Sequence, residues 1–272
     1  MSEVLRVITA NLLNNSADIA ARYQLFSECV AETNASLLCL QEVSHPNLIE
    51  GILTDLGFTS FISSASRLTR EGCDDYRMIV SKTELVDGSR MASHIDNLHP
   101  AIAFAPDYDA TFISAHFPWG GPNEARRLQY ASWLDGIAAE KSGLVFLGAD
   151  TNCELGSRTM NYLLGKDLDL NNEGTYWTNV DDNAWRLMTE DSYATVSPKT
   201  NHLAARTYQD HGGAPNVNAL PSRKIDFLLS RGWNYGKRGG VTHSFLLSPA
   251  VTLGRVGEEF SDHWGIVADL II

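Results

Sequence analysis

The stretch SDHWG at residues 261–265 places an aspartate beside a histidine, where a plain strand would carry only apolar residues. Similar polar groups end apolar, strand-like segments elsewhere. They are Asn11 after VLRVITA, Glu42 after LLCLQ, His116 after TFISA, Asp150 and Asn152 after LVFLGA, and Asp226 within KIDFLL. Carboxylates that converge with a pair of histidines at one sheet edge meet the requirements of metal-assisted hydrolysis. The pattern predicts an active site assembled from strand ends.

The candidate ligands are mostly hard oxygens. Such ligands suit Mg²⁺ or Mn²⁺, whereas a zinc site would normally bring His or Cys at characteristic spacing. The four cysteines are scattered, with no close pair that would suggest a zinc knuckle or a disulfide framework. We therefore expect Mg²⁺ or Mn²⁺ as the cofactor and a reduced interior.

Most of these residues, taken singly, also have a plainer interpretation. Glu42 could cap a helix that begins near Pro46, His116 and His263 could be satisfied core or surface histidines, and Asn11 and Asn152 could be turn formers. Asp226 is harder to explain in this way, because a buried carboxylate in a strand is costly unless it is paired. Only the set as a whole favours an active site.

The charge balance restricts how a substrate could bind. With 33 acidic and 21 basic residues, the net charge is −12 and the pI is about 5.0. The molecule as a whole repels polyanions, so any phosphate must be held locally by a cation or by a few basic side chains. The acidic pairs Asp74-Asp75 and Asp181-Asp182 are interpreted as solvated turns.

The elements that must position these groups are mainly strands. Strands are expected at 4–10, 36–43, 58–63, 76–82, 101–107, 110–117, 144–150, 224–230, 241–247 and 263–272. Helices are expected after a Ser16 cap, near 46–56 and over 123–140, and residues 171–222 are typical of long polar loops. Many strands and few helices predict two packed sheets with helices on their outer faces.

The chain shows no division and no export signal. No stretch rich in Gly, Ser and Pro separates two halves, so we expect a single domain over residues 1–272. Neither a signal peptide nor an apolar run long enough to cross a bilayer is recognised. The sequence therefore predicts a cytoplasmic protein with no membrane association and no obligate protein partner.

The ordered motifs TANLLN, QEV, SAHF, GADTN, KIDF and SDHWG resemble the endonuclease/exonuclease/phosphatase (DNase I-like) superfamily over nearly the whole chain. The pattern is nearest the DNase I and tyrosyl-DNA phosphodiesterase types. Six motifs in this order are specific, although no single one is. The resemblance implies a four-layer α/β sandwich, with two packed mixed β-sheets flanked by helices, and hydrolysis of a phosphate ester with a divalent cation. One departure is Ala10, since many members carry an aromatic residue there.

The resemblance also implies a role for each residue. Glu42 would be the principal metal ligand, Asn11 would assist the metal or the phosphate, and Asp262 would help to position metal or water. Asp150 would orient or deprotonate the attacking water, and Asn152 would donate to the phosphate. His116 would act at the phosphate or the leaving group. Asp226 would hold His263, the remaining catalytic residue, in one tautomer.

Substrate contacts are less clearly indicated. Trp119 beside Gly120 could form an aromatic platform at the cleft rim or a packed turn. Arg126, in an Arg-x-x-Gln pattern, could reach phosphate or brace the site, or lie on a solvated helix face. Arg223, with Arg206 and Lys224, flanks the long loop and is a candidate phosphate contact.

Three functions stay open on these grounds. The first is a metal-dependent phosphodiesterase or nuclease that acts on nucleic acid. The second is a phosphatase or phosphodiesterase for a small phosphorylated metabolite or a lipid headgroup. The third is a binding module without catalysis, which the completeness of the motif set disfavours.

Overall fold

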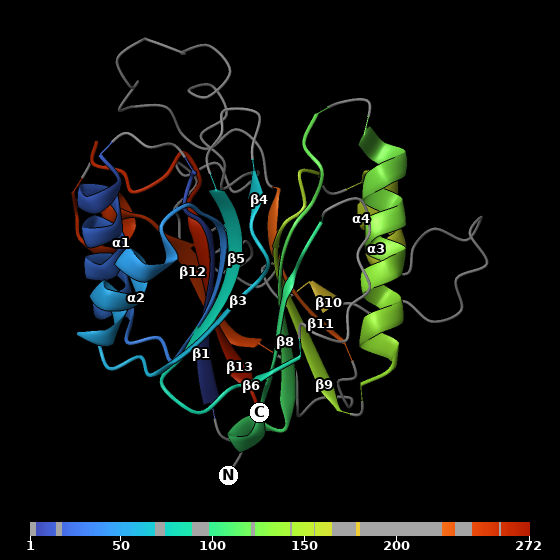
Figure 1. Ribbon diagram of the computed structural model, residues 1–272, viewed down its shortest axis with the longest axis horizontal. Coiled ribbons are helices and arrows are strands. Elements are labelled where there is room, and N and C mark those ends of the chain that lie inside the picture. The colour runs from blue at the N-terminus through green and yellow to red at the C-terminus, as the bar shows by residue number, and fades with distance from the viewer. Residues whose placement is uncertain are drawn as a thin grey trace.

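The structure is a computed structural model that describes residues 4–14, 18–68, 74–88, 98–120, 123–141, 143–154, 156–164, 178–179, 225–231, 241–255 and 257–272. Two β-sheets stand face to face, with α1 (Ile19–Thr33) and α2 (Pro46–Thr54) outside one of them. The longer α3 (Glu124–Ala139) and the short α4 (Arg158–Leu163) cover the other, as Figure 1 shows. The four-layer α/β sandwich expected from the sequence is confirmed.

The first sheet has seven strands. Its order is β12 (Val241–Leu247), β13 (Gly265–Ile271), β1 (Val4–Asn11), β2 (Leu37–Val43), β5 (Asp74–Ser81) and β3 (Ser60–Ser63), with β4 (Arg67–Leu68) also paired to β5. Only β1 and β2 are parallel neighbours, and the other pairs are antiparallel. The sheet is therefore mixed, as predicted.

The second sheet has six strands. Its order is β10 (Thr178–Asn179), β11 (Asp226–Arg231), β9 (Leu144–Asp150), β8 (Ala110–His116), β7 (Ala101–Ala105) and β6 (Val86–Asp87). Again one pair, β8 and β9, is parallel. The carboxyl ends of β1, β2, β8 and β9 share one edge of the sandwich, the upper edge in Figure 1.

Three apolar cores hold these layers together. One lies between the first sheet and the helices α1, α2 and α7 (Pro249–Thr252), and it includes Tyr23, Phe26 and Val30 of α1. A second lies under α3 and α4, where Leu134 and Ala138 are buried. The third fills the space between the sheets. Burial of this surface is the main stabilising contribution to the fold.

The sheets approach closely at Gly148 in β9. A Cβ atom added there would lie 2.6 Å from the Cβ of Cys39 and 2.9 Å from the Oγ1 of Thr9, so only glycine fits. The buried amide of Gln41 bridges the same gap. Its Nε2 donates to the Oγ of Ser114 at 3.0 Å and to the carbonyl of Gly148 at 3.2 Å. Because Gln41 precedes Glu42, this bridge fixes the base of the strand-end edge.

Several local predictions need correction. The first helix begins at Ile19 with Asp18 as its N-cap and no side-chain capping bond, so the Ser16 cap is wrong. Ser16 itself lies outside the described residues. The strand expected at 101–107 ends at Ala105, because Pro106 starts a 3-10 turn over Pro106–Tyr108, labelled η2. The short elements β4, β6, α4 and α7 were not expected.

The polar stretch 171–222 lies outside the described residues apart from Thr178–Asn179, so its interpretation as loops stays a prediction. Among the described helices, none combines the length and the apolar character that crossing a membrane requires.

Candidate active site

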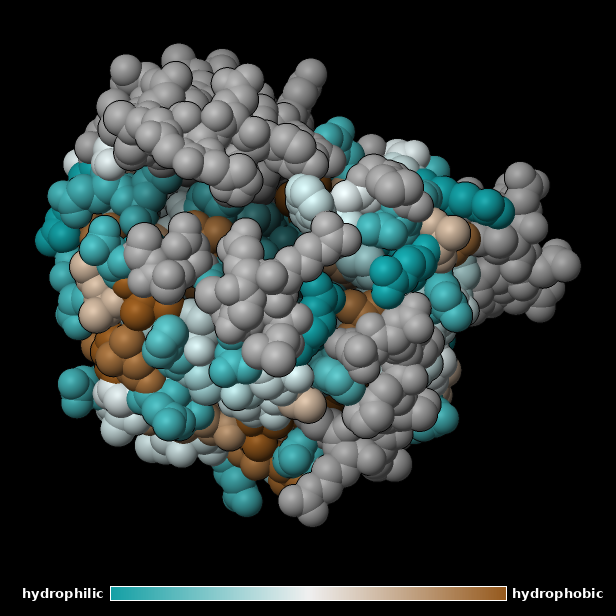
Figure 2. All heavy atoms as spheres, turned by 45° about the horizontal axis from the view of Figure 1, so that its top comes forward, coloured by the Kyte–Doolittle hydropathy of each residue, from teal (hydrophilic) through white to brown (hydrophobic). Residues whose placement is uncertain are grey.

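Strand register brings the predicted polar residues to one edge. His116 at the end of β8 pairs with Asp150 at the end of β9, and Asp226 at the start of β11 pairs with Asp150 from the other side. Asn11 ends β1 on the facing sheet. Figure 2 turns this edge toward the viewer and shows hydrophilic side chains, in teal, among the grey segments. Asn11, Asp150 and Asp226 are themselves buried, so the edge gathers buried polar side chains at the ends of mainly apolar strands.

Asn11 ties the two sheets together at this edge. Its Nδ2 donates to Oε1 of Glu42 and to Oδ2 of Asp150, each at 3.0 Å, and its Oδ1 accepts from the backbone N–H of Leu13 at 2.9 Å. The amide nitrogen, and not the oxygen, therefore faces the carboxylates. In this arrangement Asn11 aligns two acids, and its role as a metal ligand stays a prediction.

Glu42 is directed into the site by an irregular backbone. The pairing of β2 with β5 shifts register between Leu40 and Val43, and Glu42 has a φ of 52°. A non-glycine residue in the left-handed region costs about 1 kcal/mol or more, which is typical of functional positions. Oε2 of Glu42 accepts from the backbone N–H of Asn14 at 3.1 Å. The alternative that Glu42 caps α2 is wrong, since His45 is the N-cap.

Burial and neighbouring charges shift the pKa of Glu42. Burial raises the pKa of its carboxyl, and the nearby charges of Asp75 and Asp262 raise it further, against the opposing effects of His116 and Asn11. A carboxylate that is held among other acids in this way is stabilised by positive charge.

His116 lies between acids on both of its ring nitrogens. Nε2 is 3.6 Å from Oε1 of Glu42 and 3.5 Å from Oδ2 of Asp150, and Nδ1 is 3.8 Å from Oδ2 of Asp75. Burial disfavours the charged imidazolium, but the contact with Asp75 and the charges of Asp150 and Glu42 outweigh it and raise the pKa of His116. The acids around His116 thus favour protonation of the ring more than water does.

Asp75 and Arg77 form a buried pair behind His116. Asp75 is 1% exposed, and its Oδ2 lies 3.2 Å from Nη1 of Arg77, which is fully buried. The interpretation of Asp74-Asp75 as a solvated turn is therefore wrong for Asp75. Although burial opposes ionisation, the bond to His116 and the charge of Arg77 lower the pKa of Asp75. The spacing could have revealed this pair, because residues i and i+2 of a strand share a face.

His263 and Asp226 form the tightest contact of the site. His263 Nδ1 lies 2.8 Å from Oδ2 of Asp226, and its backbone N–H donates to Oγ of Ser261 at 3.2 Å. Nε2 is then directed to the acids, 3.9 Å from Oδ2 of Asp150 and 3.9 Å from Oδ1 of Asp262. The contact of Asp226 with His263 agrees with the dyad expected from the motif order.

Burial and neighbouring charges set the ionisation of this pair. Burial raises the pKa of Asp226 to about 7, with a smaller increase from the charge of Asp150. Burial alone would lower the pKa of His263, but Asp226 and Asp262 together raise it well above the ordinary value. A proton between the two residues is therefore held on the histidine side.

The donor set fits a hard divalent cation. Among the described residues, two groups of three offer ligand atoms within 4.8 Å of one another: Glu42, His116 and Asp150, and Asp150, Asp226 and His263. Carboxylate oxygens dominate both groups, and Glu42 is destabilised by like charge, so a dication would relieve the repulsion. Asp262 belongs to neither group, and its role as a ligand stays a prediction.

Of the remaining predicted residues, Asn152 contacts the edge directly. Asn152 follows Asp150 with a φ of 51°, its backbone N–H donates to Oδ1 of Asp150 at 2.9 Å, and its Nδ2 donates to the carbonyl of Phe117 at 3.0 Å. Trp119 is 61% exposed, and Arg126 is exposed on α3. Arg223 lies outside the described residues. The substrate roles of all four stay predictions.

Two arginines that were not predicted as site residues brace the loops of the site. Arg22 of α1 donates to the carbonyls of Leu12 at 2.8 Å, Leu13 at 3.0 Å and Phe260 at 3.2 Å, and so joins the loops that carry Asn11 and His263. Arg127, the neighbour of Arg126, braces the loop after His116. Backbone carbonyls at loop positions leave no mark in the sequence, so these partners required coordinates.

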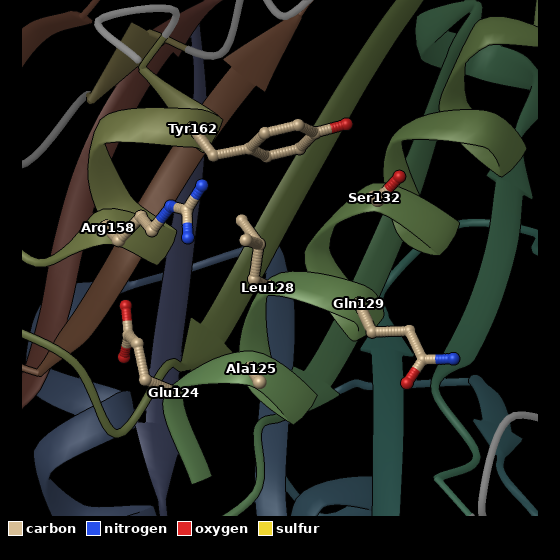
Figure 3. Close-up of a pocket in the computed structure, with 7 residues that line it drawn as sticks. All are labelled: Glu124, Ala125, Leu128, Gln129, Ser132, Arg158 and Tyr162. Atoms are coloured by element: carbon tan, nitrogen blue, oxygen red, sulfur yellow. The ribbon is translucent and has the colours of Figure 1, made fainter. Parts of the chain in front are cut away.

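A separate groove lies on the outer layer. It has a volume of about 680 Å³ and runs between α3 and α4, where Arg158 and Tyr162 of α4 face Glu124 and Leu128 of α3 (Figure 3). It contains none of the residues at the strand-end edge.

A four-layer sandwich that gathers paired acids and two histidines at one edge defines a DNase I-like phosphoesterase with a candidate metal site. The sequence profile of the Endonuclease/Exonuclease/phosphatase family matches residues 8–263. The chain belongs to this family. Comparison with curated protein sequences gives no match.

Solved structures with the same fold include truncated TDP2 from Caenorhabditis elegans, with 17% identity, a TM-score of 0.65 and coverage of 99% of this chain and 98% of that one. TDP2 from D. rerio complexed with single strand DNA product shows 15% identity and a TM-score of 0.64 over 99% and 100%. A family protein from Bacteroides thetaiotaomicron shows 13% identity and a TM-score of 0.65 over 100% and 96%. These similarities establish the fold.

Proposed function

We propose that this protein is a divalent-metal-dependent phosphodiesterase that hydrolyses nucleic acid by attack of water on phosphorus. The observation that carries the proposal is the position of Asp150, whose carboxylate belongs both to the group with Glu42 and His116 and to the group with Asp226 and His263. One carboxylate between a cation site and a histidine dyad is placed to orient a water molecule against a bound phosphate.

The metal would be held by Glu42, with Asp150 and His116 beside it. When bound, Mg²⁺ or Mn²⁺ supplies positive charge that stabilises the oxygens of the phosphate. The chain's own residues then provide the proton chemistry. Asp150 accepts the proton of the attacking water, and Asp226 holds His263 so that its Nε2–H faces the site.

Charge develops on the phosphate oxygens during in-line attack, and fixed donors stabilise it. The pKa values of His263 and His116 are both raised, because acids surround each ring. His116 stands on the opposite side of Asp150 from Asp226, and it is suited to the phosphate or the leaving group. Asn152 has a second amide proton for the phosphate beside the one given to Phe117.

A nucleic-acid substrate is supported by the fold comparison. The D. rerio TDP2 structure of the same fold contains a single strand DNA product. Arg126 and Arg223 are the basic residues proposed to contact the phosphates of such a strand. A short single strand or a strand end suits this acidic protein better than a long duplex, because fewer phosphates then meet its net charge of −12.

A second candidate is a small phosphorylated molecule as the substrate. The same net charge favours it, since a single phosphate is repelled less than a polymer. The site chemistry would be unchanged, with the phosphate of the metabolite in the same position.

Purified protein should be assayed with Mg²⁺, with Mn²⁺ or with EDTA against plasmid, single-stranded oligonucleotide and a panel of phosphomonoesters. We expect cleavage of the oligonucleotide that EDTA abolishes. Asp150→Ala and His263→Ala should each lower kcat by about 100-fold or more. Cleavage of phosphomonoesters alone would select the second candidate. Hydrolysis of no substrate, or wild-type rates in both variants, would refute the proposed chemistry.

A further inference from the structure

The loop from Phe117 to Gly120, directly after His116, is fixed at every carbonyl. The carbonyl of Phe117 accepts from Nδ2 of Asn152 at 3.0 Å, and that of Pro118 accepts from Nη1 of Arg127 at 3.1 Å. The carbonyl of Trp119 accepts from Nδ2 of Asn123. That of Gly120 accepts from Nη1 of Arg127 at 2.9 Å. Four consecutive loop carbonyls bound in this way leave the backbone little freedom.

The loop is also fastened at its first residue. The backbone N–H of Phe117 donates to the carbonyl of Asp150 at 2.8 Å. The Phe117 ring is 1% exposed and packs edge-on against Tyr130, with 4.9 Å between ring centroids. The loop is thus attached both to the catalytic strand end and to the buried face of α3.

Arg127 anchors the loop through a partly buried network. It is 7% exposed, and its Nε and Nη2 donate to Oε2 of Glu124 at 3.2 and 3.1 Å. Oε1 of Glu124 accepts in turn from the N–H of Thr159 at 2.7 Å and from its hydroxyl at 3.0 Å. The loop is therefore connected through Glu124 to both α3 and α4, which adjoin the groove of Figure 3.

Trp119 stands in contrast to this rigid backbone. Its side chain is 61% exposed and is the most exposed large hydrophobic side chain among the described residues. Trp119 is three positions after His116, so the two Cα atoms lie at most about 11 Å apart. An indole presented to solvent on a fixed loop is preorganised for a partner, because little conformational entropy is lost when one binds.

We propose that the loop Phe117–Gly120 is a built stacking platform, on which Trp119 receives a flat aromatic group attached to the scissile phosphate, with Arg127 as the residue that positions it. This inference rests on the proposed phosphoester hydrolysis and names its substrate class: esters that carry a ring, above all a nucleobase. A ring face stacks on indole without a requirement for base sequence, so the platform selects for a base and not for its identity.

The direct test is binding of two oligonucleotides that resist cleavage through phosphorothioate linkages, one of thymidines and one of tetrahydrofuran abasic residues. Calorimetry in Mg²⁺ gives the Kd of each. We expect the wild type to bind the base-bearing strand about 5- to 100-fold more tightly, from the usual contribution of a stacked base. Trp119→Ala should abolish this preference, and Trp119→Phe should retain most of it.

Val251→Ala is the matched control, because Val251 is also an exposed apolar residue, at 41%, and lies on α7 away from the loop. It should leave both Kd values unchanged. A preference for the base-bearing strand that survives in Trp119→Ala, or equal Kd values in the wild type, would overturn the platform. Phenyl phosphate as a competitor separates the sources of the ring: competition that depends on Trp119 indicates any flat ring, and its absence restricts the platform to nucleobases.

The role of Arg127 is tested by kinetics on cleavable versions of the same strands. Arg127→Lys keeps the charge but cannot reach two carbonyls and Glu124 together. We expect a raised KM for the base-bearing strand with kcat retained on the abasic strand, and no change in Arg158→Gln. If Arg127→Lys does not fold, Asn123→Ala, which frees the carbonyl of Trp119, tests in the same way whether a fixed loop backbone is needed for the base-dependent KM. Equal effects on both strands would assign Arg127 a merely structural role.

These outcomes are distinguishable from failure of the proposed function. A base preference that depends on Trp119, in a protein that hydrolyses no phosphate ester, would sustain the platform and refute the chemistry. Metal-dependent hydrolysis without a base preference would support the proposed chemistry and refute the platform.

Discussion

Replacement of Asp226 by asparagine separates catalysis from stability. Asp226 is 1% exposed, and its Oδ2 lies 2.8 Å from Nδ1 of His263. Asparagine has the same shape but no charge, so His263 loses the partner that fixes its tautomer. A hydrogen bond to a charged group contributes about 1.5–3 kcal/mol, against about 1 kcal/mol for a neutral one. The weaker bond and a His263 proton on the wrong ring nitrogen should together lower kcat about 100- to 10,000-fold.

The free energy of unfolding should change little in the same variant. Burial raises the pKa of Asp226 to about 7, so the carboxylate is poorly stabilised in the folded state. The remaining imidazole can release its proton, and no unpaired buried charge is left behind. We therefore expect a loss of about 1 kcal/mol or less by urea unfolding. The KM should stay near the wild-type value, because Asp226 acts through His263.

The pH profile provides a further readout. The carboxylate of Asp226 raises the pKa of His263, so its removal lowers that pKa. Activity that requires protonated His263 is lost as pH rises through this pKa. The alkaline limb of the kcat profile should therefore move to lower pH in Asp226→Asn.

Asp269→Asn is the matched control on β13. Asp269 binds Arg6 through two bonds, from Nε at 2.6 Å and from Nη2 at 2.7 Å, at a site remote from the strand-end edge. Loss of the ion pair between Asp269 and Arg6 should lower the free energy of unfolding by about 1 kcal/mol and leave kcat unchanged. Wild-type turnover in Asp226→Asn, or a loss of activity that only follows a loss of fold, would refute the reasoning.

Three further predictions concern the base of the site and its charge. Gly148→Ala should destabilise the fold by about 1–3 kcal/mol or more in urea, because the added methyl would lie 2.6 Å from Cys39; an unchanged midpoint would mean that the sheets can separate. Asp75→Asn should lower the free energy of unfolding by about 3–5 kcal/mol, because it leaves the charge of Arg77 buried without its carboxylate. The double variant Asp75→Asn with Arg77→Met should recover part of this loss. Simple additivity of the two single changes would contradict a coupled pair. Mg²⁺ at 100 times its Kd should stabilise the wild type by about 2.7 kcal/mol, and a thermal shift that persists in Glu42→Gln would place the ion elsewhere.

The sequence was a sufficient guide to the strands and to most of the acids at their ends. Apolar runs predicted each long strand to within a few residues, because the alternation of side chains is a local property. Asp226 was predicted to need a partner, since a lone carboxylate in a strand is costly, and the structure supplies His263. The prediction that the first helix starts after a Ser16 cap was wrong. Asp18, only two residues further on, is also a residue type common at N-caps, and local sequence does not decide between the two.

Residues that act through the backbone could not be predicted in this way. Arg22 and Arg127 donate to loop carbonyls, and any residue supplies a carbonyl, so no side-chain pattern marks the partner. Asp75 was misinterpreted because an acidic pair is usually solvated. Its burial follows from the face of β5 on which it lies, since Asp75 shares that face with Ile79, which packs in the core between the two sheets.

The sequence alone determined the class of fold, the order of the strands along the chain and the kind of chemistry available, since these depend on residue types and on local periodicity. The tertiary structure decided which acids share a proton or a cation site, which histidine nitrogen faces them, and which arginine of the pair at 126–127 is buried. Those properties depend on distances of a few ångströms between segments far apart in the chain. Strand register and sheet packing set such distances, and local sequence does not encode them.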